Sequence, residues 1–162
     1  MTDLQHVHGM PGHLIRRCQQ IAVALFLDEC AGHNLTPVQF AVLCAIAANP
    51  GVEQNALAGL VAIDRSTVGN VVSRLEGRAL LVREPDVADR RLKRMRLTRS
   101  GEHLIAAARP AVERTQDRLL APLDADERRI FVACLARIAD VNNTASRAPL
   151  GPPAPISETS PA

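Results

Sequence analysis

Apolar residues between positions 54 and 75 recur at helical spacing in two consecutive blocks. They fall three or four residues apart, which places them on one buried face of each helix. The first block has Leu57, Leu60 and Val61, and the second has Val68, Val71, Val72 and Leu75. Asp64 stands just before the second block and is a favourable N-cap residue. The pattern predicts two short helices joined by a tight turn.

The opposite face of the second predicted helix carries hydroxyl, amide and guanidinium groups. Such groups bind phosphate oxygens and base edges. The DNA-binding candidates are Arg65, Ser66, Thr67, Asn70 and Arg74. Asn70 is the best candidate for reading a base, because its amide can form two hydrogen bonds to adenine. We expect Arg74 to hold a phosphate, whereas Ser66 and Thr67 suit either role; the alternative is an ordinary solvated helix face.

A basic hairpin is predicted directly after these helices. Residues 80–84 and 92–97 read as two strands around a loop at 85–91. Seven basic residues stand against three acids here: Arg83, Arg90, Arg91, Lys93, Arg94, Arg96 and Arg99 against Glu84, Asp86 and Asp89. The net charge of +2 for the whole chain understates this local charge, which is the charge that contacts DNA phosphates. Arg90, Arg91 and Arg94 of the hairpin are therefore DNA-binding candidates too, although Arg90 and Arg94 can equally be no more than wing charge.

Capping signals delimit the remaining predicted helices. Pro11 suits the first turn of a helix that ends near Gly32, and Thr36 opens another that ends at residues 49–51. The expected buried face of this second helix contains Phe40, Leu43, Cys44 and Ala47. Thr98 is expected to cap a long helix through Leu120, with a kink or local bend at Pro110. A capping signal at residues 124–127 opens the last helix, whose apolar side contains Ile130, Cys134, Leu135 and Ile138.

The order of these elements resembles the winged helix-turn-helix of the MarR family of bacterial transcription regulators. The resemblance rests on Leu75-Glu76, on residues 80–83, on Asp89-Arg90-Arg91 and on residues 97–101, and it covers roughly residues 10–143. It implies a homodimer whose second motif helix enters the major groove of duplex DNA while each wing reaches a minor groove. The family's wing arginine corresponds to Arg91, with Asp89 as the acid that orients it. Ala79 stands where the family usually has glycine.

The expected fold is mainly α with a small β-wing, a winged helix-turn-helix joined to a helical dimerisation region. Residues 1–9 are expected to form an irregular N-terminal arm. A single domain follows at 10–143, with dimerisation helices at 10–32 and 102–143 and the winged helix-turn-helix at about 36–101. The terminal helices are amphipathic and would expose apolar surface in a monomer, which favours a dimer. Residues 144–162 are proline-rich and predicted to be a disordered tail.

Composition narrows the class of protein. The chain is 47% hydrophobic and has neither a membrane-spanning run nor a signal peptide, so a cytoplasmic location is expected. Its only aromatic residues are Phe26, Phe40 and Phe131, which disfavours single-stranded nucleic acid as the target, because such binding uses aromatic stacking. No catalytic motif or metal-ligand spacing is present, so we expect no enzyme activity, metal or cofactor.

The four cysteines leave an alternative open. Cys18, Cys30, Cys44 and Cys134 show no metal-binding spacing, and the simplest interpretation is small buried residues in a reducing compartment. A redox-sensing regulator on the same fold would use Cys18 or Cys30 as its reactive thiol. A second alternative is a DNA-binding protein without sequence preference.

The N-terminal stretch 9–17 is a candidate ligand site. It also resembles the opening of MarR-family repressors that control the breakdown of aromatic acids, nicotinate among them. The candidate ligand-binding residues are His8, Met10, Pro11, His13, Leu14 and Arg17. Their cations and apolar side chains can hold a carboxylate over aliphatic walls. The expected partner is a small aromatic carboxylate that releases the repressor from DNA, with 6-hydroxynicotinate as the first choice from the resemblance.

Overall fold

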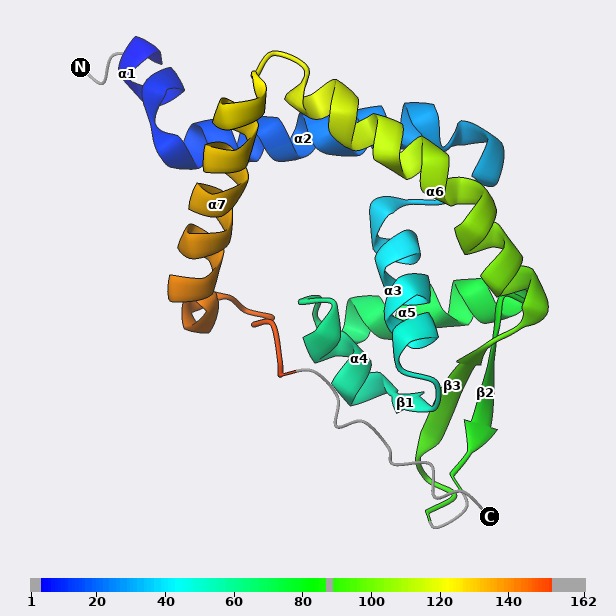
Figure 1. The fold of residues 1–162 in the computed structure, drawn as a ribbon. Helices are drawn as coiled ribbons and strands as arrows, with labels where there is room; N and C mark the ends of the chain where they lie inside the picture. Colours follow the sequence, from blue (N-terminus) through cyan, green and yellow to red (C-terminus); the bar gives the residue numbers. More distant parts are fainter. Residues whose placement is uncertain (1–3, 87–88, 153–162) are drawn as a thin grey trace.

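The computed structural model describes residues 4–86 and 89–152, and helices dominate it (Figure 1). The helices are α1 (Leu4–Gly9), α2 (Pro11–Glu29), α3 (Pro37–Ala48), α4 (Gln54–Leu60), α5 (Arg65–Gly77), α6 (Arg99–Leu120) and α7 (Ala125–Val141). The short 3-10 turns are η1 (Ala31–His33) and η2 (Asn143–Ala145), and the strands are β1 (Val52–Glu53), β2 (Leu81–Pro85) and β3 (Lys93–Leu97). The predicted fold class, mainly α with a small β-wing, is confirmed.

The hydrophobic core lies where α3 meets α4, α5 and the sheet. Val42, Leu43 and Ile46 of α3 are fully buried. The sequence predicted Phe40, Leu43, Cys44 and Ala47 as the buried face of this helix, but Ala47 is exposed and Phe40 and Cys44 are half-buried. Nearly every residue of α3 is apolar, so spacing alone does not identify its buried face.

The wing is a three-stranded antiparallel sheet in the order β1-β3-β2. Met95 of β3 pairs with Arg83 on one side and with Val52 on the other, and its side chain is fully buried. The predicted hairpin is therefore confirmed, although each strand begins one residue later than expected. Part of its predicted loop, residues 87–88, lies outside the described residues.

The side-chain caps predicted for three of the helices are confirmed. Thr36 and Asp124 each form a complete capping box with the residue three positions on, Gln39 and Glu127. The Thr98 hydroxyl accepts from the Gly101 amide at 3.1 Å and opens α6. This helix continues without interruption through Pro110. A Cβ added at Gly101 would stand 2.1 Å from the Leu80 carbonyl oxygen, so only glycine lets α6 approach the wing this closely.

Alanine adopts a left-handed conformation in the turn of the helix-turn-helix and directly after its second helix. Ala62 after α4 and Ala79 after α5 have φ values of 51° and 55°. After α5, the Leu80 amide donates to the Leu75 carbonyl and the Ala79 amide donates to the Glu76 carbonyl, the bonds of a Schellman cap. Ala79 therefore takes the conformation that the family's glycine would adopt, at the steric cost of a Cβ.

The two ends of the chain differ from their predictions. Residues 4–9, expected to be irregular, form α1. Residues 144–152, expected to belong to a disordered tail, include the end of η2 and hydrogen-bond to α4; the rest of that tail, 153–162, lies outside the described residues. The first long helix ends at Glu29 rather than near Gly32, and η1 and a left-handed Asn34 follow it.

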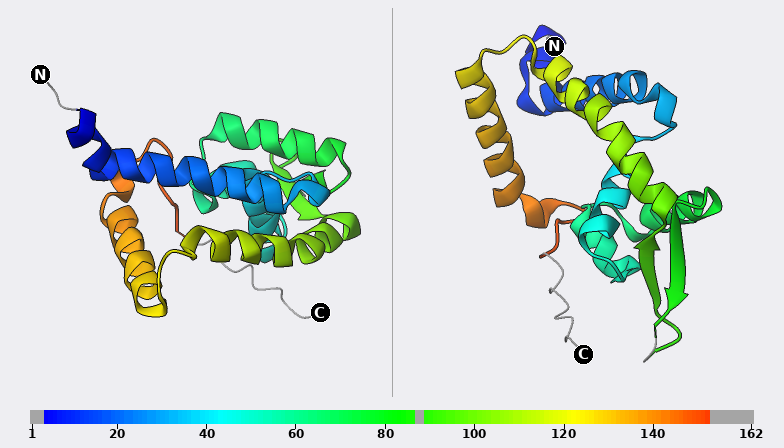
Figure 2. Two further views of the ribbon diagram at one scale, coloured as in Figure 1. Left: turned by 90° about the horizontal axis from the view of Figure 1, so that it is seen from above. Right: turned by 45° about the vertical axis from the view of Figure 1, so that its right-hand side comes forward.

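The helices α2 and α7 carry exposed apolar side chains. No residue of α7 is buried, and Ile138 and Val141 are 50% and 76% exposed. On α2, Ile15, Ile21 and Leu27 are all between 46% and 48% exposed. Figure 2 shows α1 and the first half of α2 extending away from the helix-turn-helix, with α7 set apart from it. Among residues 4–86 and 89–152, no helix is both long enough and apolar enough to cross a bilayer.

Candidate nucleic-acid interface

The start of α5 is organised by Asp64. Its carboxylate accepts from the Ser66 hydroxyl at 2.6 Å, from the Thr67 amide at 2.8 Å and from the Thr67 hydroxyl at 2.7 Å. These bonds, that from Ser66 first, hold the pKa of the Asp64 carboxyl far below its usual range. The hydroxyl groups of Ser66 and Thr67 already donate their protons to Asp64, so both oxygens can only accept hydrogen bonds from DNA. Their predicted DNA contacts remain predictions.

The outer face of α5 presents the other candidates. Arg65, Asn70 and Arg74 are exposed, while Val68, Val72 and Leu75 on the opposite face are fully buried. Within the described part of the chain, the side chains of Arg65, Asn70 and Arg74 make no intramolecular hydrogen bond or ion pair. Their donors are therefore available to phosphates or base edges, the geometry expected of a recognition helix.

Arg94 is held by its own protein. Its Nε forms an ion pair with Asp86, its Nη2 lies 3.4 Å from a Glu53 carboxylate oxygen, and its Nη1 donates to the Gly51 carbonyl at 3.2 Å. The guanidinium thus joins β3 to β1 and to the wing loop, and the adjacent acids, Asp86 first, raise its pKa. The structure gives Arg94 a role in positioning the wing, whereas sequence reasoning took it as a DNA contact.

The base of the wing is tied to α5 by a second ion pair. Arg83 of β2 forms two hydrogen bonds to one carboxylate oxygen of Glu76. Hydrogen bonding to Arg83 lowers the pKa of Glu76. The wing and the recognition helix are therefore connected by a charged pair as well as by the core.

Asp89 supports Arg91 through the backbone. One Asp89 carboxylate oxygen accepts from the Arg91 amide at 2.9 Å, and the Asp89 amide donates to the Asp86 carboxylate at 2.9 Å. Arg90 and Arg91 are exposed beyond this turn. The resemblance implied that Asp89 orients Arg91, and these bonds show how it can do so.

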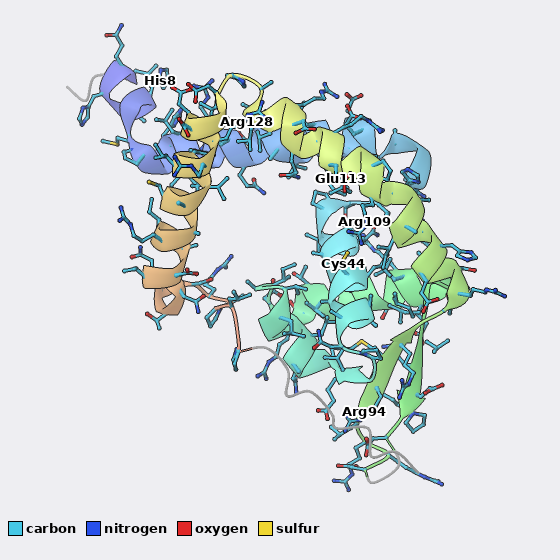
Figure 3. The ribbon with its side chains drawn as sticks, in the orientation of Figure 1. His8, Cys44, Arg94, Arg109, Glu113 and Arg128 are labelled. Atoms are coloured by element: carbon cyan, nitrogen blue, oxygen red, sulfur yellow. The ribbon has the colours of Figure 1, made fainter. Side chains whose placement is uncertain are left out.

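The candidate ligand residues lie at the opposite end of the protomer. His8 and His13 are neighbours, with ring centroids 5.2 Å apart. Partial burial lowers the pKa of His13, and the charges of Arg16, His8 and Arg17 lower it further. Met10, Pro11, Leu14 and Arg17 are exposed on α2 and its N-cap. Figure 3 shows His8 far from Arg94 of the wing. A single chain therefore brings His8 and His13 together but leaves most of the other candidate ligand residues exposed to solvent.

Sequence reasoning assigned no role to Arg109 and Glu113 of α6, which are both exposed. Figure 3 shows them, with Cys44 of α3, well removed from His8, and burial raises the pKa of the Cys44 thiol more than the charge of Arg109 lowers it. Arg109 and Glu113 looked like ordinary surface residues of an amphipathic helix. Only their four-residue spacing on one helix face could have drawn attention to them.

Burial disfavours two of the four cysteines as reactive thiols. Desolvation raises the pKa of Cys30 and that of Cys44, which keeps both thiols protonated. Cys18 is exposed, so the expectation of a buried cysteine is wrong there, and Cys134 is half-buried. Across the described residues, no cluster of three metal-binding side chains occurs.

Comparison with known proteins identifies the family. The MarR family model matches residues 33–92. The HTH-type transcriptional repressor NicR of Pseudomonas putida is 32% identical over 134 residues, which is 83% of this chain and 85% of NicR.

Two solved structures extend the likeness to three dimensions. CouR, a transcriptional repressor bound to a 23-mer DNA duplex, has a TM-score of 0.79 at 34% identity and covers 86% of this chain and 99% of its own. Bordetella bronchiseptica BpsR, whose DNA binding is regulated by 6-hydroxynicotinic acid, has a TM-score of 0.78 at 34% identity, covering 82% of this chain and 95% of its own.

The fold and the exposed polar face of α5 define a winged helix-turn-helix DNA-binding protein. The chain belongs to the MarR family of transcription regulators. Its relatives are named as regulators and repressors, which agrees with the prediction that it is not an enzyme.

Proposed function

We propose that this chain is a homodimeric repressor that binds an inverted-repeat operator and leaves it when a small aromatic carboxylate binds. The observation that carries the proposal is the outer face of α5. Arg65, Asn70 and Arg74 are exposed there without intramolecular partners within the described residues, beside a wing whose position is set by Arg94 and Arg83. A rigid helix with unpaired donors suits the major groove.

A dimer accounts for the apolar surface of α2 and α7. Ile130, Ile138 and Val141 share one side of α7 and are 50% to 76% exposed, and contiguous apolar faces of this kind usually mark an interface. A two-fold dimer would place its two α5 helices about 34 Å apart, one turn of DNA, so that both enter successive major grooves. The operator should therefore be an inverted repeat.

An aromatic carboxylate is the effector that best fits the N-terminal residues. Arg17, His8 and His13 supply cations and donors, and Met10, Pro11 and Leu14 supply apolar contacts. A carboxylate in a partly dry site requires such partners, and a second protomer would complete the enclosure. The relative BpsR responds to 6-hydroxynicotinic acid, which supports 6-hydroxynicotinate as the first compound to test. Such a ligand lowers DNA affinity only if it binds better to a conformation whose α5 spacing mismatches the groove.

Two experiments test the proposal. A duplex selected by the protein from a random pool should compete far better than random duplex, and equal competition would favour a DNA-binding protein without sequence preference. Calorimetry with 6-hydroxynicotinate should show binding to wild type and weakened binding to His8→Ala and Arg17→Ala. No binding to wild type would reject this effector, and undiminished binding to both variants would reject the site.

The redox alternative now rests mainly on Cys18. It is an exposed cysteine, and burial raises the thiol pKa at Cys30 and Cys44. Peroxide should leave DNA binding unchanged in wild type and in Cys18→Ser. Loss of binding in wild type alone would establish the redox switch instead.

A further inference from the structure

The segment after α7 returns to the helix-turn-helix and docks on α4. The Asn143 side chain holds the Leu150 backbone at both of its polar groups: Nδ2 donates to the Leu150 carbonyl at 2.9 Å, and Oδ1 accepts from the Leu150 amide at 2.7 Å. The next residue, Gly151, donates its amide to the Gly59 carbonyl at 2.9 Å. Figure 1 shows this segment in orange, running from the end of α7 to α4. We call residues 143–151 the C-terminal strap.

The strap contacts α4 backbone to backbone. A Cβ added at Gly151 would lie 3.3 Å from the Gly59 Cα, and one added at Gly59 would lie 3.5 Å from the Gly151 Cα. Within the strap, the Ala148 amide donates a hydrogen bond of 3.2 Å to the Ser146 hydroxyl, and this bond stabilises the turn that contains Arg147. Docking therefore fixes the place of Arg147 relative to α5.

A hollow of about 540 Å³ separates the strap from the start of α5. Arg147 and Pro149 line it from the strap, and Asn55, Arg65 and Ser66 line it from the helix-turn-helix. Both arginines are exposed, and neither forms an ion pair with any other described residue. Two unpaired guanidiniums from distant parts of the sequence thus share one hollow.

Asp64 is the acid that lines this hollow. Its carboxylate accepts three hydrogen bonds from Ser66 and Thr67, which direct its charge into the first turn of α5. The Thr67 amide is already bonded to Asp64, and the side chains that line the hollow supply further donors for an anion there. The two arginines outweigh Asp64 by one positive charge, and the Asn55 amide adds donors.

We propose that this hollow holds a backbone phosphate of the DNA bound by α5, with Arg147 of the strap as a phosphate contact beside Arg65. The inference rests on the proposed function, because α5 must lie in a major groove for a flanking phosphate to reach its first turn. Guanidinium groups suit phosphate oxygens in charge and geometry. A phosphate contact positions the protein and carries no sequence information.

The salt dependence of DNA binding tests this contact directly. The probe is a duplex that wild type selects from a random pool, titrated at several salt concentrations. Arg147→Ala should reduce the slope of log affinity against log salt by about 1 for each protomer. Affinity should fall by a similar factor on selected and random duplex, and Arg147→Lys should retain most of the slope.

Two further variants separate docking from charge. Asn143→Ala removes both bonds to Leu150 and should weaken binding in the same direction as Arg147→Ala without removing a charge. Arg16→Ala removes an exposed charge on α2 and should leave the slope unchanged. An unchanged slope, or tighter binding, in Arg147→Ala would overturn the strap contact while wild-type preference for its selected duplex still supports the proposed function. Absence of any such preference in wild type would overturn the proposed function itself.

Discussion

The winged helix-turn-helix and the pair of helices α2 and α7 bury their apolar residues to very different extents. In the first, Leu43, Leu57, Val72 and Met95 are fully buried within one chain. In the second, α7 has no buried residue at all. The DNA-binding half is thus complete as a single chain, whereas the other half leaves apolar faces uncovered. This difference is what the proposed dimer predicts, with DNA contact on one part of the chain and subunit contact on another.

The largest effect on the self-contained half is expected at Gly101. Because a Cβ there would stand 2.1 Å from the Leu80 carbonyl oxygen, Gly101→Ala should force α6 away from the wing and lower the free energy of unfolding by about 3 kcal/mol. Gly77→Ala is the matched control, since a Cβ at Gly77 meets nothing within 4 Å, and it should cost nothing. Urea denaturation measures both, and equal stability of the two variants would contradict this packing.

Substitutions on the exposed apolar faces of α2 and α7 should weaken dimerisation without lowering the stability of the folded chain. Ile138 is 50% exposed on α7, so Ile138→Asp should weaken dimerisation by about 2 kcal/mol, roughly 30-fold in the dissociation constant. Sedimentation gives the mass, and circular dichroism should show unchanged helix content. A variant that remains a dimer at low micromolar concentration would show that α7 does not form the interface.

A smaller gain in stability is expected at Ala79. Its φ of 55° is strained for a residue with a Cβ, so Ala79→Gly should raise the free energy of unfolding by up to about 1 kcal/mol. Ala62→Gly, at a φ of 51°, should behave alike. Thermal unfolding of both variants is the measurement, and a clear loss of stability in both would contradict relief of strain.

The smallest effect concerns the Arg83–Glu76 pair. The pKa of Glu76 is lowered in the folded protein by its hydrogen bonds to Arg83. A depressed pKa adds stability above the unfolded value near 4.5, and this is lost as the pH falls through the folded value. Both side chains are about one-third exposed, so the effect should stay below about 1 kcal/mol. Glu76→Gln should flatten the fall in stability below pH 4.5, and an unchanged pH profile would show that the pair contributes nothing.

Local signals in the sequence were sufficient for much of the fold. The capping boxes at Thr36 and Asp124, the Asp64 cap and the basic hairpin depend on neighbours within a few residues, and the structure has all of them. The strand β1 was missed because it is only two residues long, too short to show alternation. The buried face of α3 was misassigned because an almost wholly apolar helix has no polar face to reveal it.

Features that depend on contacts between residues far apart in the chain could not be predicted from the sequence. Arg94 looked like one more basic residue of the wing, and its bond to Gly51 joins positions 43 residues apart. The strap looked like a disordered tail because its composition is polar and proline-rich. Its docking depends on the Gly59 carbonyl, a backbone acceptor that composition does not show. The candidate ligand residues stay predictions, because one chain leaves most of them exposed and shows no surface that encloses them among the described residues.

The central claim is that α5 reads duplex sequence through Asn70, and one titration tests it. Wild type and Asn70→Ala would be titrated against the selected duplex, against the same duplex with one base pair changed at each position of the half-site, and against random duplex. Asn70→Ala should lose about 1 to 3 kcal/mol on the selected duplex. Its preference should disappear at one position in each half-site, with binding to random duplex unchanged. Equal losses on selected and random duplex would contradict base reading by Asn70.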